Sequence, residues 1–266
     1  MARGRVAKLL VERVDLRGGV PEVHRQPDEL IVEEPLEIHL DGHLVTTTMR
    51  TPGDDFELAA GLCFTDGLLA GAAVTRCRYC GECGSAMETA FNVVTVETGG
   101  RAPIPVARVA TTTSSCGLCG SASIEALQQR LSPLCGLAEI SLEVLAAAPG
   151  WARQEQGLFD ATGAVHAAAA FTADGETLVV REDIGRHNAV DKVVGRLLFD
   201  ERLPAHDLGL YVSGRASFEI VQKAWAAGFA AIVAVSAPSS LAVETARAAG
   251  LMLAGFVRDG HMNVYS

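Results

Sequence analysis

Two runs rich in apolar residues near the start of the chain predict a pair of β-strands. They cover residues 30–40 and 44–50 and flank Asp41-Gly42, a dipeptide typical of a tight hairpin turn. The following segment, Thr51-Pro-Gly-Asp-Asp55, leads into an apolar stretch that ends near Cys63 and predicts a helix. Aspartate favours the position that caps a helix, so we expect Asp54 or Asp55 to cap it.

Further strands are predicted at residues 91–97 and 104–110 of the first half. Residues 1 to about 27 are polar and rich in arginine, and we expect them to be loosely ordered. The first half is therefore predicted to be α plus β.

The second half alternates short apolar strands with helices. Residues 165–171 and 177–180 flank Asp174-Gly175, a second hairpin signal. The expected elements that follow are a helix at 186–199, a strand at 208–212, a helix at 218–227, a strand at 230–235, a helix at 239–249 and a strand at 251–257. This alternation predicts an α/β layered sheet that is partly parallel.

Composition narrows the class of protein. The 266 residues are 49% hydrophobic and 20% charged, which is ordinary for a globular protein, and the net charge is −10. The acidic balance and the lack of a Lys/Arg-rich block argue against a nucleic-acid binder. We expect no secretory leader and no membrane span, and hence a cytoplasmic protein whose seven cysteines serve chemistry rather than disulfides.

The most informative motif is Cys116-Gly-Leu-Cys119-Gly120. It lies between a Thr/Ser-rich stretch, residues 111–115, and a predicted helix that starts near Ser121. A helix N-terminus favours the thiolate, which is both the nucleophile and the metal-binding form of cysteine. The pair is compatible with half of a zinc site, a redox dithiol or a persulfide carrier, and the residues alone leave these alternatives open.

A second cluster, Cys77-Arg-Tyr-Cys80-Gly-Glu-Cys83, is the main rival signal. Together with the first pair it offers thiolates for zinc, although the gap exceeds the usual ribbon spacing of roughly fifteen to twenty residues. Cys63 and Cys135 neighbour apolar residues, and we expect both to be buried.

Polar loops follow two of the predicted strands, Ser213-Gly-Arg215 and Ser236-Ala-Pro-Ser-Ser240. Ligands of open α/β sheets bind at such strand ends, and helix N-termini there hold phosphate. We expect these loops to face one crevice for a phosphate-containing ligand, with Arg186, Arg215 and Arg258 as anion donors. The segment around Arg181 to Lys192 reads either as a solvated helix start capped by Asp183 or as a polar pocket wall.

Taken together, six ordered motifs resemble the formate dehydrogenase accessory sulfurtransferase family, the FdhD family. They are Arg50-Thr-Pro-Gly-Asp-Asp55, Cys116-Gly-Leu-Cys119-Gly120, Arg181-Glu-Asp-Ile-Gly-Arg-His-Asn188, Ser213-Gly-Arg215, Ser236-Ala-Pro-Ser-Ser240 and Asn263-Val-Tyr265. The resemblance runs from about Glu33 to the C-terminus.

The resemblance implies a cytidine-deaminase-like layered mixed sheet flanked by helices, with a smaller α+β N-terminal part. We divide the chain into an N-terminal α+β part with hairpin strands at 1–110, a mobile Cys-x-x-Cys loop and helix at 111–135, and the α/β core at 136–266. The zinc deaminase signature is absent, because Ala168 stands where the proton-shuttling Glu would follow His166.

The same resemblance implies a sulfur carrier that moves sulfur from a cysteine desulfurase persulfide to a molybdenum bis(molybdopterin guanine dinucleotide) cofactor and so activates formate dehydrogenase. Cys116 is expected to carry the persulfide, as a sulfurtransferase-type catalytic residue. The cofactor, a bound substrate rather than a permanent group, is expected at Phe256, Val257, Arg258, Asp259, Gly260 and His261. No metal ligand is assigned.

A homodimer is the expected assembly, and the role of Cys119 stays open. Two alternatives to the sulfur carrier remain: a molybdenum-cofactor-binding chaperone with dispensable cysteines, and a zinc-stabilised interaction module.

Overall fold

A computed structural model describes residues 4–79, 90–106 and 131–266 of the chain. Its larger sheet has six strands in the order β12-β11-β10-β9-β7-β8. Their bounds are β7 His166–Thr172, β8 Thr177–Asp183, β9 Leu208–Val212, β10 Ala231–Ala234, β11 Met252–Arg258 and β12 His261–Val264. β10 is parallel to both of its neighbours, whereas β7 and β12 run antiparallel to theirs.

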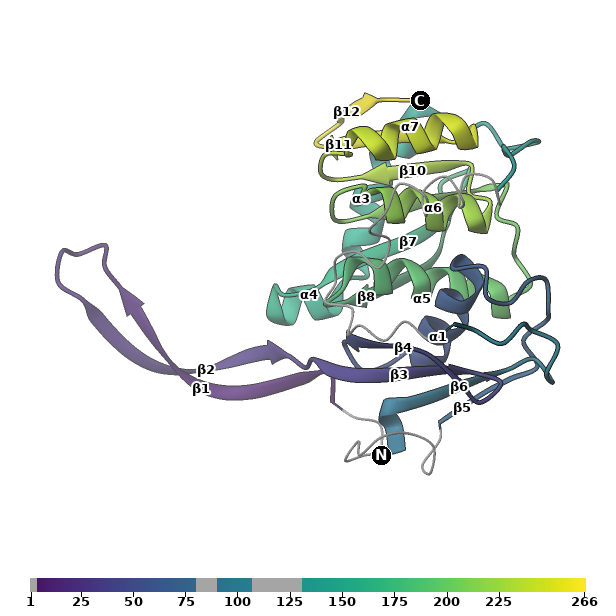
Figure 1. Cartoon of the computed structure of the whole chain (residues 1–266). Helices are drawn as coiled ribbons and strands as arrows, with labels where there is room; N and C mark the ends of the chain where they lie inside the picture. Colours follow the sequence, from purple (N-terminus) through teal and green to yellow (C-terminus); the bar gives the residue numbers. More distant parts are fainter. Residues whose placement is uncertain (1–3, 80–89, 107–130) are drawn as a thin grey trace.

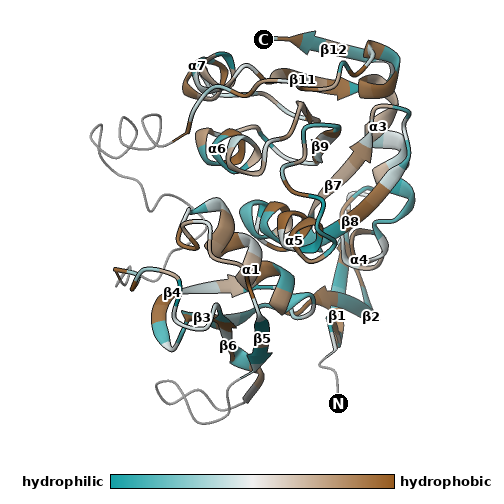
Figure 2. Cartoon of the chain, turned by 90° about the vertical axis from the view of Figure 1, so that its right-hand side faces the viewer, coloured by the Kyte–Doolittle hydropathy of each residue, from teal (hydrophilic) through white to brown (hydrophobic). Residues whose placement is uncertain are grey.

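Helices cover both faces of the larger sheet. One face packs against α5 (Arg186–Phe199), α6 (Phe218–Ala227) and α7 (Ser240–Ala249), and the other packs against α3 (Leu142–Gln154). A short helix, α4 (Gly157–Thr162), follows α3. Since both faces are buried, the inner strands β7, β9, β10 and β11 are apolar at most positions, and β7 and β11 show hydrophobic colours along most of their length (Figure 2).

A smaller sheet of four strands, in the order β4-β3-β6-β5, forms the N-terminal part. Its elements are β3 Glu34–Leu40, β4 His43–Arg50, α1 Asp55–Thr65, β5 Arg76–Tyr79, the 3₁₀ turn η1 Ala90–Asn92 and β6 Val93–Glu97. Apolar side chains of β3, β6 and α1 form a core of their own. The predicted layered mixed sheet flanked by helices, with a smaller α+β N-terminal part, is therefore confirmed.

Two glycines allow the smaller part to dock on the larger one through α1 and α5. A Cβ atom on Gly61 would lie 1.9 Å from the backbone oxygen of Asp191, and one on Gly195 would lie 1.9 Å from that of Glu57. No side chain fits into either approach, so these positions fix how closely the two helices cross.

Residues 4–27 do not behave as expected. β1 (Val6–Asp15) and β2 (Glu22–Ile31) form an antiparallel hairpin with ten residue pairs, which we call the arm. It projects away from the rest of the molecule (Figure 1). The expectation of loose order is wrong because it rested on polar composition, and both faces of this hairpin are exposed.

Some of the other local predictions are confirmed, and others are wrong. Both Asp-Gly hairpins form, and α5, α6 and α7 begin within a residue of their expected starts. Asp54 occupies the cap position of α1, but its side chain pairs with Arg5 and makes no cap bond. Residues 104–106 form no strand, and the rest of that expected strand lies outside the described residues.

The described cysteines differ from each other. Cys63 is buried as expected, and burial raises the pKa of its thiol. Cys135 is exposed, contrary to expectation, because the segment after Leu134 runs along the surface. The proposed boundaries at 110 and 135 stay a prediction, since residues 107–130 lie outside the described part. No helix in the described part has the length and apolar character needed to cross a membrane.

Candidate functional site at the carboxyl edge of the larger sheet

Four strands of the larger sheet end at one edge. β7 is antiparallel to both β8 and β9, and β10 is parallel to β9 and β11, so β8, β9, β10 and β11 share one direction. Helices α5, α6 and α7 follow three of these strands and therefore begin at the same edge. Helix N-termini present unpaired N–H groups and partial positive charge, so this edge suits an anionic ligand.

The loops at this edge are joined to one another. Ala216, after β9, forms a parallel bridge with Pro238, and the Ser239 backbone N–H donates to the Ala216 oxygen at 3.1 Å. The loop after β10 reaches β11 in turn, because the Phe256 N–H donates to the Ser236 oxygen at 3.2 Å. The two loops expected to face one crevice are therefore neighbours, and the β11 segment borders them.

Some of the serines at this edge are already occupied. The Ser213 hydroxyl accepts a hydrogen bond from the Ala167 N–H at 2.9 Å and ties the β9 loop to β7. The Ser239 hydroxyl accepts from the Ala242 N–H and caps α7. Both hydroxyls help to fix these loops, and each keeps its own O–H group for donation to an anionic ligand.

Basic side chains gather at Gly214. A Cβ atom there would lie 3.4 Å from His166 Nδ1 and 3.8 Å from Arg186 Cδ. Burial lowers the pKa of His166, and the charges of Arg186 and His187 lower it further. The Arg186 Nε is buried and has no hydrogen-bond partner in the described part of the chain. An unsatisfied guanidinium nitrogen at this edge is a ready anion donor.

A small polar cluster stands at the start of α6. His187 Nε2 lies 3.4 Å from the Ser217 hydroxyl and 3.5 Å from a Glu219 carboxylate oxygen, and Ser217 donates to Glu219 at 2.8 Å. Ser217 precedes α6 without capping it. The hydrogen bond from His187, with help from Ser217, lowers the pKa of Glu219 to about 2. This cluster holds the His187 ring beside the crevice in one orientation.

The segment expected to bind the cofactor forms the hairpin turn between β11 and β12. Asp259 and Gly260 make the turn with φ angles of 50° and 75°. A pocket of about 510 Å³ opens there, and its lining residues are Phe256, Arg258, Asp259, His261, Met262 and Asn263. Val257 differs from the others because its side chain is fully buried in the core, so only its backbone faces a ligand.

The expected catalytic residue, Cys116, lies outside the described residues together with Cys119, Cys80 and Cys83. The chain re-enters the described part at Leu131. There, Trp225 Nε1 donates to the Ser132 oxygen at 2.9 Å, and the Leu134 N–H donates to the Ala249 oxygen at 2.8 Å. These anchors lie at the C-terminal ends of α6 and α7, opposite the crevice.

Of the rival metal cluster, the structure describes Cys77 alone. It lies on β5, and burial raises the pKa of its thiol to about 12. Within the described residues no group of three His, Cys, Asp or Glu side chains is placed to hold a metal ion. A site built with Cys80 and Cys83 stays untested.

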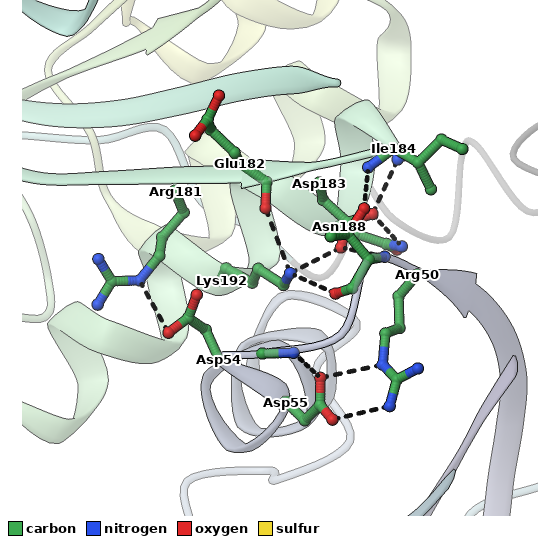
Figure 3. A network of polar contacts seen from close by, with 12 residues as sticks. Arg50, Asp54, Asp55, Arg181, Glu182, Asp183, Ile184, Asn188 and Lys192 are labelled. Carbon is green, nitrogen blue, oxygen red and sulfur yellow. Dashed lines mark hydrogen bonds and ion pairs between the residues drawn. The ribbon is translucent and has the colours of Figure 1, made fainter. Parts of the chain in front are cut away.

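Sequence reasoning missed the polar network that joins the two parts of the molecule (Figure 3). Asp183 and Lys192 are both fully buried and lie 2.7 Å apart. Asp183 also accepts hydrogen bonds from the backbone N–H groups of Thr51 and Gly185. Asp183 is therefore not a solvated helix cap: it holds the 50–55 segment against the start of α5.

A second pair in this network is Arg50 and Asp55. The guanidinium donates twice to the carboxylate, at 3.0 and 2.9 Å, with Arg50 fully buried. Nearby, Arg181 of β8 donates to both carboxylate oxygens of Glu57 on α1. The signal for this network was present in the sequence as charged residues within otherwise apolar elements. The contacts that cross between the two parts, Thr51–Asp183 and Glu57–Arg181, join residues more than 120 positions apart.

The chain is similar to known proteins over most of its length. The FdhD/NarQ family matches residues 31–266. Proteins named "Sulfur carrier protein FdhD" from Mycolicibacterium paratuberculosis and Streptomyces coelicolor are 51% and 50% identical to this chain, covering 91% and 92% of it and 91% and 89% of their own lengths. One of the same name from Anaeromyxobacter dehalogenans is 44% identical over 98% of this chain and 93% of its own.

A solved structure shares the fold. A crystal structure described as a formate dehydrogenase accessory protein from Desulfotalea psychrophila superimposes with a TM-score of 0.75, covering 97% of this chain and 96% of its own. Their sequence identity is 22%, so this likeness concerns the fold alone.

Proposed function

Because this chain belongs to the FdhD/NarQ family, we propose that it is a sulfur carrier that matures formate dehydrogenase. The observation that carries the proposal is the identity of about half of all residues to proteins named as sulfur carriers, over nearly their whole length. The finer proposal is that sulfur comes from a cysteine desulfurase persulfide and goes to molybdenum bis(molybdopterin guanine dinucleotide).

The first step assigns the chemistry to Cys116. Its thiolate attacks the outer sulfur of the donor's cysteine persulfide, the S–S bond of the donor breaks, and the donor's thiolate leaves. The product is a persulfide on Cys116. Gly117 and Gly120 each follow one of the two cysteines and add little bulk, which suits a thiol that must meet another protein.

The second step delivers the sulfur. In the route that uses Cys119, its thiolate attacks the inner sulfur of the Cys116 persulfide, forms a disulfide and releases hydrosulfide to the cofactor. Both electrons of the sulfide then come from the two thiols, and an external thiol reduces the disulfide afterwards. In the other route Cys119 only donates a hydrogen bond to the persulfide. An external thiol then attacks the inner sulfur, forms a mixed disulfide with Cys116 and releases hydrosulfide to the cofactor, and a second external thiol reduces that disulfide.

The carboxyl edge of the larger sheet supports a phosphate-rich substrate. Three helix N-termini, the unsatisfied Arg186 Nε and the exposed Arg215 offer donors for a pyrophosphate, and the pocket at 256–261 offers space beside them. The acidic net charge of −10 is no obstacle, because the local potential at the edge decides binding. The cofactor is thus proposed as cargo, with Phe256 to His261 as its contact segment.

The proposal also names partners: a cysteine desulfurase as donor, formate dehydrogenase as client, and a second copy of the chain. A cofactor-binding chaperone with dispensable cysteines and a zinc-stabilised module predict different outcomes in the same experiment.

Mass spectrometry after incubation with a cysteine desulfurase and cysteine tests the proposal. We expect a gain of one sulfur on the Cys116 peptide and no gain in Cys116→Ala. Cys135 is the matched control, because its thiol is exposed and free and so reports nonspecific labelling.

A cell-based readout completes the test. In cells that lack their own copy, Cys116→Ala should leave formate dehydrogenase inactive, whereas Cys135→Ala should restore it. Full rescue by the Cys116→Ala/Cys119→Ala variant would favour the chaperone instead. Zinc that is lost on replacing Cys80 and Cys83 would favour the interaction module.

A further inference from the structure

The arm formed by β1 and β2 lacks the support that hairpins usually need. An isolated two-stranded hairpin is at best marginally stable in water, and it gains stability from a third strand or from a helix packed against it. In the described part of the chain, α4 lies against β2, while the arm's outer part stands clear of the body (Figure 1). Leu10, Val14 and Val23 there are 68%, 53% and 53% exposed. Leu9 and Leu30 on the opposite face are 53% and 40% exposed, so exposure alone does not distinguish the two faces of the arm.

The arm has two faces, because side chains alternate along each strand. The register pairs Lys8 with Glu29 and Glu12 with Arg25, which places both pairs on one face with Leu10 and Pro27 between them. The Lys8–Glu29 and Glu12–Arg25 ion pairs measure 2.8 and 3.3 Å. We call this the striped face, and beyond its two ion pairs it carries further apolar pairs, Val6–Ile31 toward the base and Val14–Val23 toward the tip.

The two ion pairs of the striped face have opposite polarity. In the inner pair the cation lies on β1, as Lys8, and in the outer pair it lies on β2, as Arg25. The other face lacks this order: its outermost pair joins Asp15 to Glu22, which places like charges opposite each other.

This arrangement is complementary to itself under a twofold rotation. Consider two arms stacked with their striped faces together and their strands antiparallel. The twofold axis that relates them lies between the two faces and runs across the strands at Leu10 and Pro27. Lys8 then lies over the partner's Glu12, and Glu29 lies over the partner's Arg25, so that all four facing charges are opposite. Leu10 meets its own copy, and the apolar pair at the base meets the pair at the tip. A self-complementary patch is the requirement for a twofold interface.

We propose that the striped face of the arm is the surface through which two copies of this chain associate, stacked face to face and antiparallel. A parallel stack also opposes unlike charges, but it crowds the two bodies together at the arm bases, whereas the antiparallel stack separates them. The inference extends the homodimer of the proposed function. The sulfur chemistry does not depend on it: a monomeric chain that still takes up sulfur on Cys116 overturns this inference alone.

Charge exchange within one ion pair tests the stack. Lys8→Glu/Glu29→Lys keeps the ion pair within the arm but makes every facing contact of the antiparallel stack repulsive. Like charges that face each other repel, so sedimentation velocity should show a dimer dissociation constant raised more than about tenfold over that of the unaltered chain. Glu12→Arg/Arg25→Glu should do the same.

Restoring the pattern supplies the matched control. Mixing the two exchanged variants opposes unlike charges again and should yield a heterodimer, and the chain with all four exchanges should dimerise with itself. Leu10→Glu should yield monomers, whereas Leu9→Glu, on the other face, should not. A monomeric unaltered chain, or a dimer that is insensitive to the exchanges, overturns the proposal; insensitivity would indicate a parallel stack, pairing at strand edges or another surface.

Discussion

The junction between the two parts of the molecule and the carboxyl edge of the larger sheet use charged residues in opposite ways. At the junction, Arg50 and Lys192 are fully buried, and each faces a carboxylate. At the edge, the Arg186 Nε has no partner in the described part of the chain, and Arg215 is exposed. One motif, residues 181–188, contributes to both regions.

Within that motif, the buried and paired charges stabilise the fold, whereas the unpaired basic groups are available to a ligand. A charge taken out of water must be paired and hydrogen-bonded, so the paired groups at the junction act on the fold. A basic group left unpaired beside helix N-termini gains no ion pair that would stabilise the fold. Pairing in the structure, rather than position in the motif, therefore tells the two roles apart.

The largest effect is expected at the junction. Lys192→Met leaves the fully buried Asp183 without its cation, which should lower the free energy of unfolding by about 3–5 kcal/mol. Urea denaturation measures the change. Arg196→Met is the control, since Arg196 pairs with Asp200 on the surface of α5 and its loss should cost less than about 1 kcal/mol. A loss below about 1 kcal/mol for Lys192→Met would contradict the assignment.

A substitution at the edge should lower ligand affinity and leave the free energy of unfolding nearly unchanged. Arg215→Met removes an exposed side chain, so the free energy of unfolding should stay within about 0.5 kcal/mol of the unaltered chain. Its affinity for guanosine 5′-diphosphate, which has the guanosine and pyrophosphate of the proposed cofactor, should fall about tenfold, or about 1.4 kcal/mol. Calorimetric titration measures the affinity, with Arg196→Met again as the control. Equal affinity in both variants would remove Arg215 from the site.

Local signals in the sequence were sufficient for most of the larger sheet. Its inner strands and its helices are short and apolar on their buried faces, and Asp174-Gly175 marks the β7–β8 turn, so period and turn chemistry agree there. The carboxyl edge followed from the same reasoning, because polar loops after consecutive strands meet at one edge once the strands are parallel.

The junction and the arm did not follow from local signals. The bond between Thr51 and Asp183 joins residues 132 positions apart, and only the helix crossing at Gly61 and Gly195 brings them together. The arm was misjudged because cross-strand ion pairs make a two-sided exposed hairpin as polar as a disordered segment. Cys135 was misjudged because an apolar neighbour does not determine burial.

The smallest effect concerns the carboxylate at the edge. The His187 bond lowers the folded-state pKa of Glu219 to about 2, below its ordinary value of 4.5. A depressed pKa stabilises the fold above the unfolded value, so this contribution is complete above about pH 4.5 and is lost as the pH falls toward 2. Glu219 is only half-buried, so solvent screens the pair and keeps the effect small.

Glu219→Gln should therefore weaken the pH dependence of stability without abolishing folding. The free energy of unfolding of the unaltered chain should exceed that of Glu219→Gln at pH 6, and the gap should narrow by pH 3, as urea denaturation at the two pH values measures. The exposed Glu139→Gln should show no such narrowing. If the gap instead stays constant, the hydrogen bond from His187 does not stabilise the Glu219 carboxylate in the folded state. The ion pairs that stabilise the fold would then lie at the junction rather than at the edge.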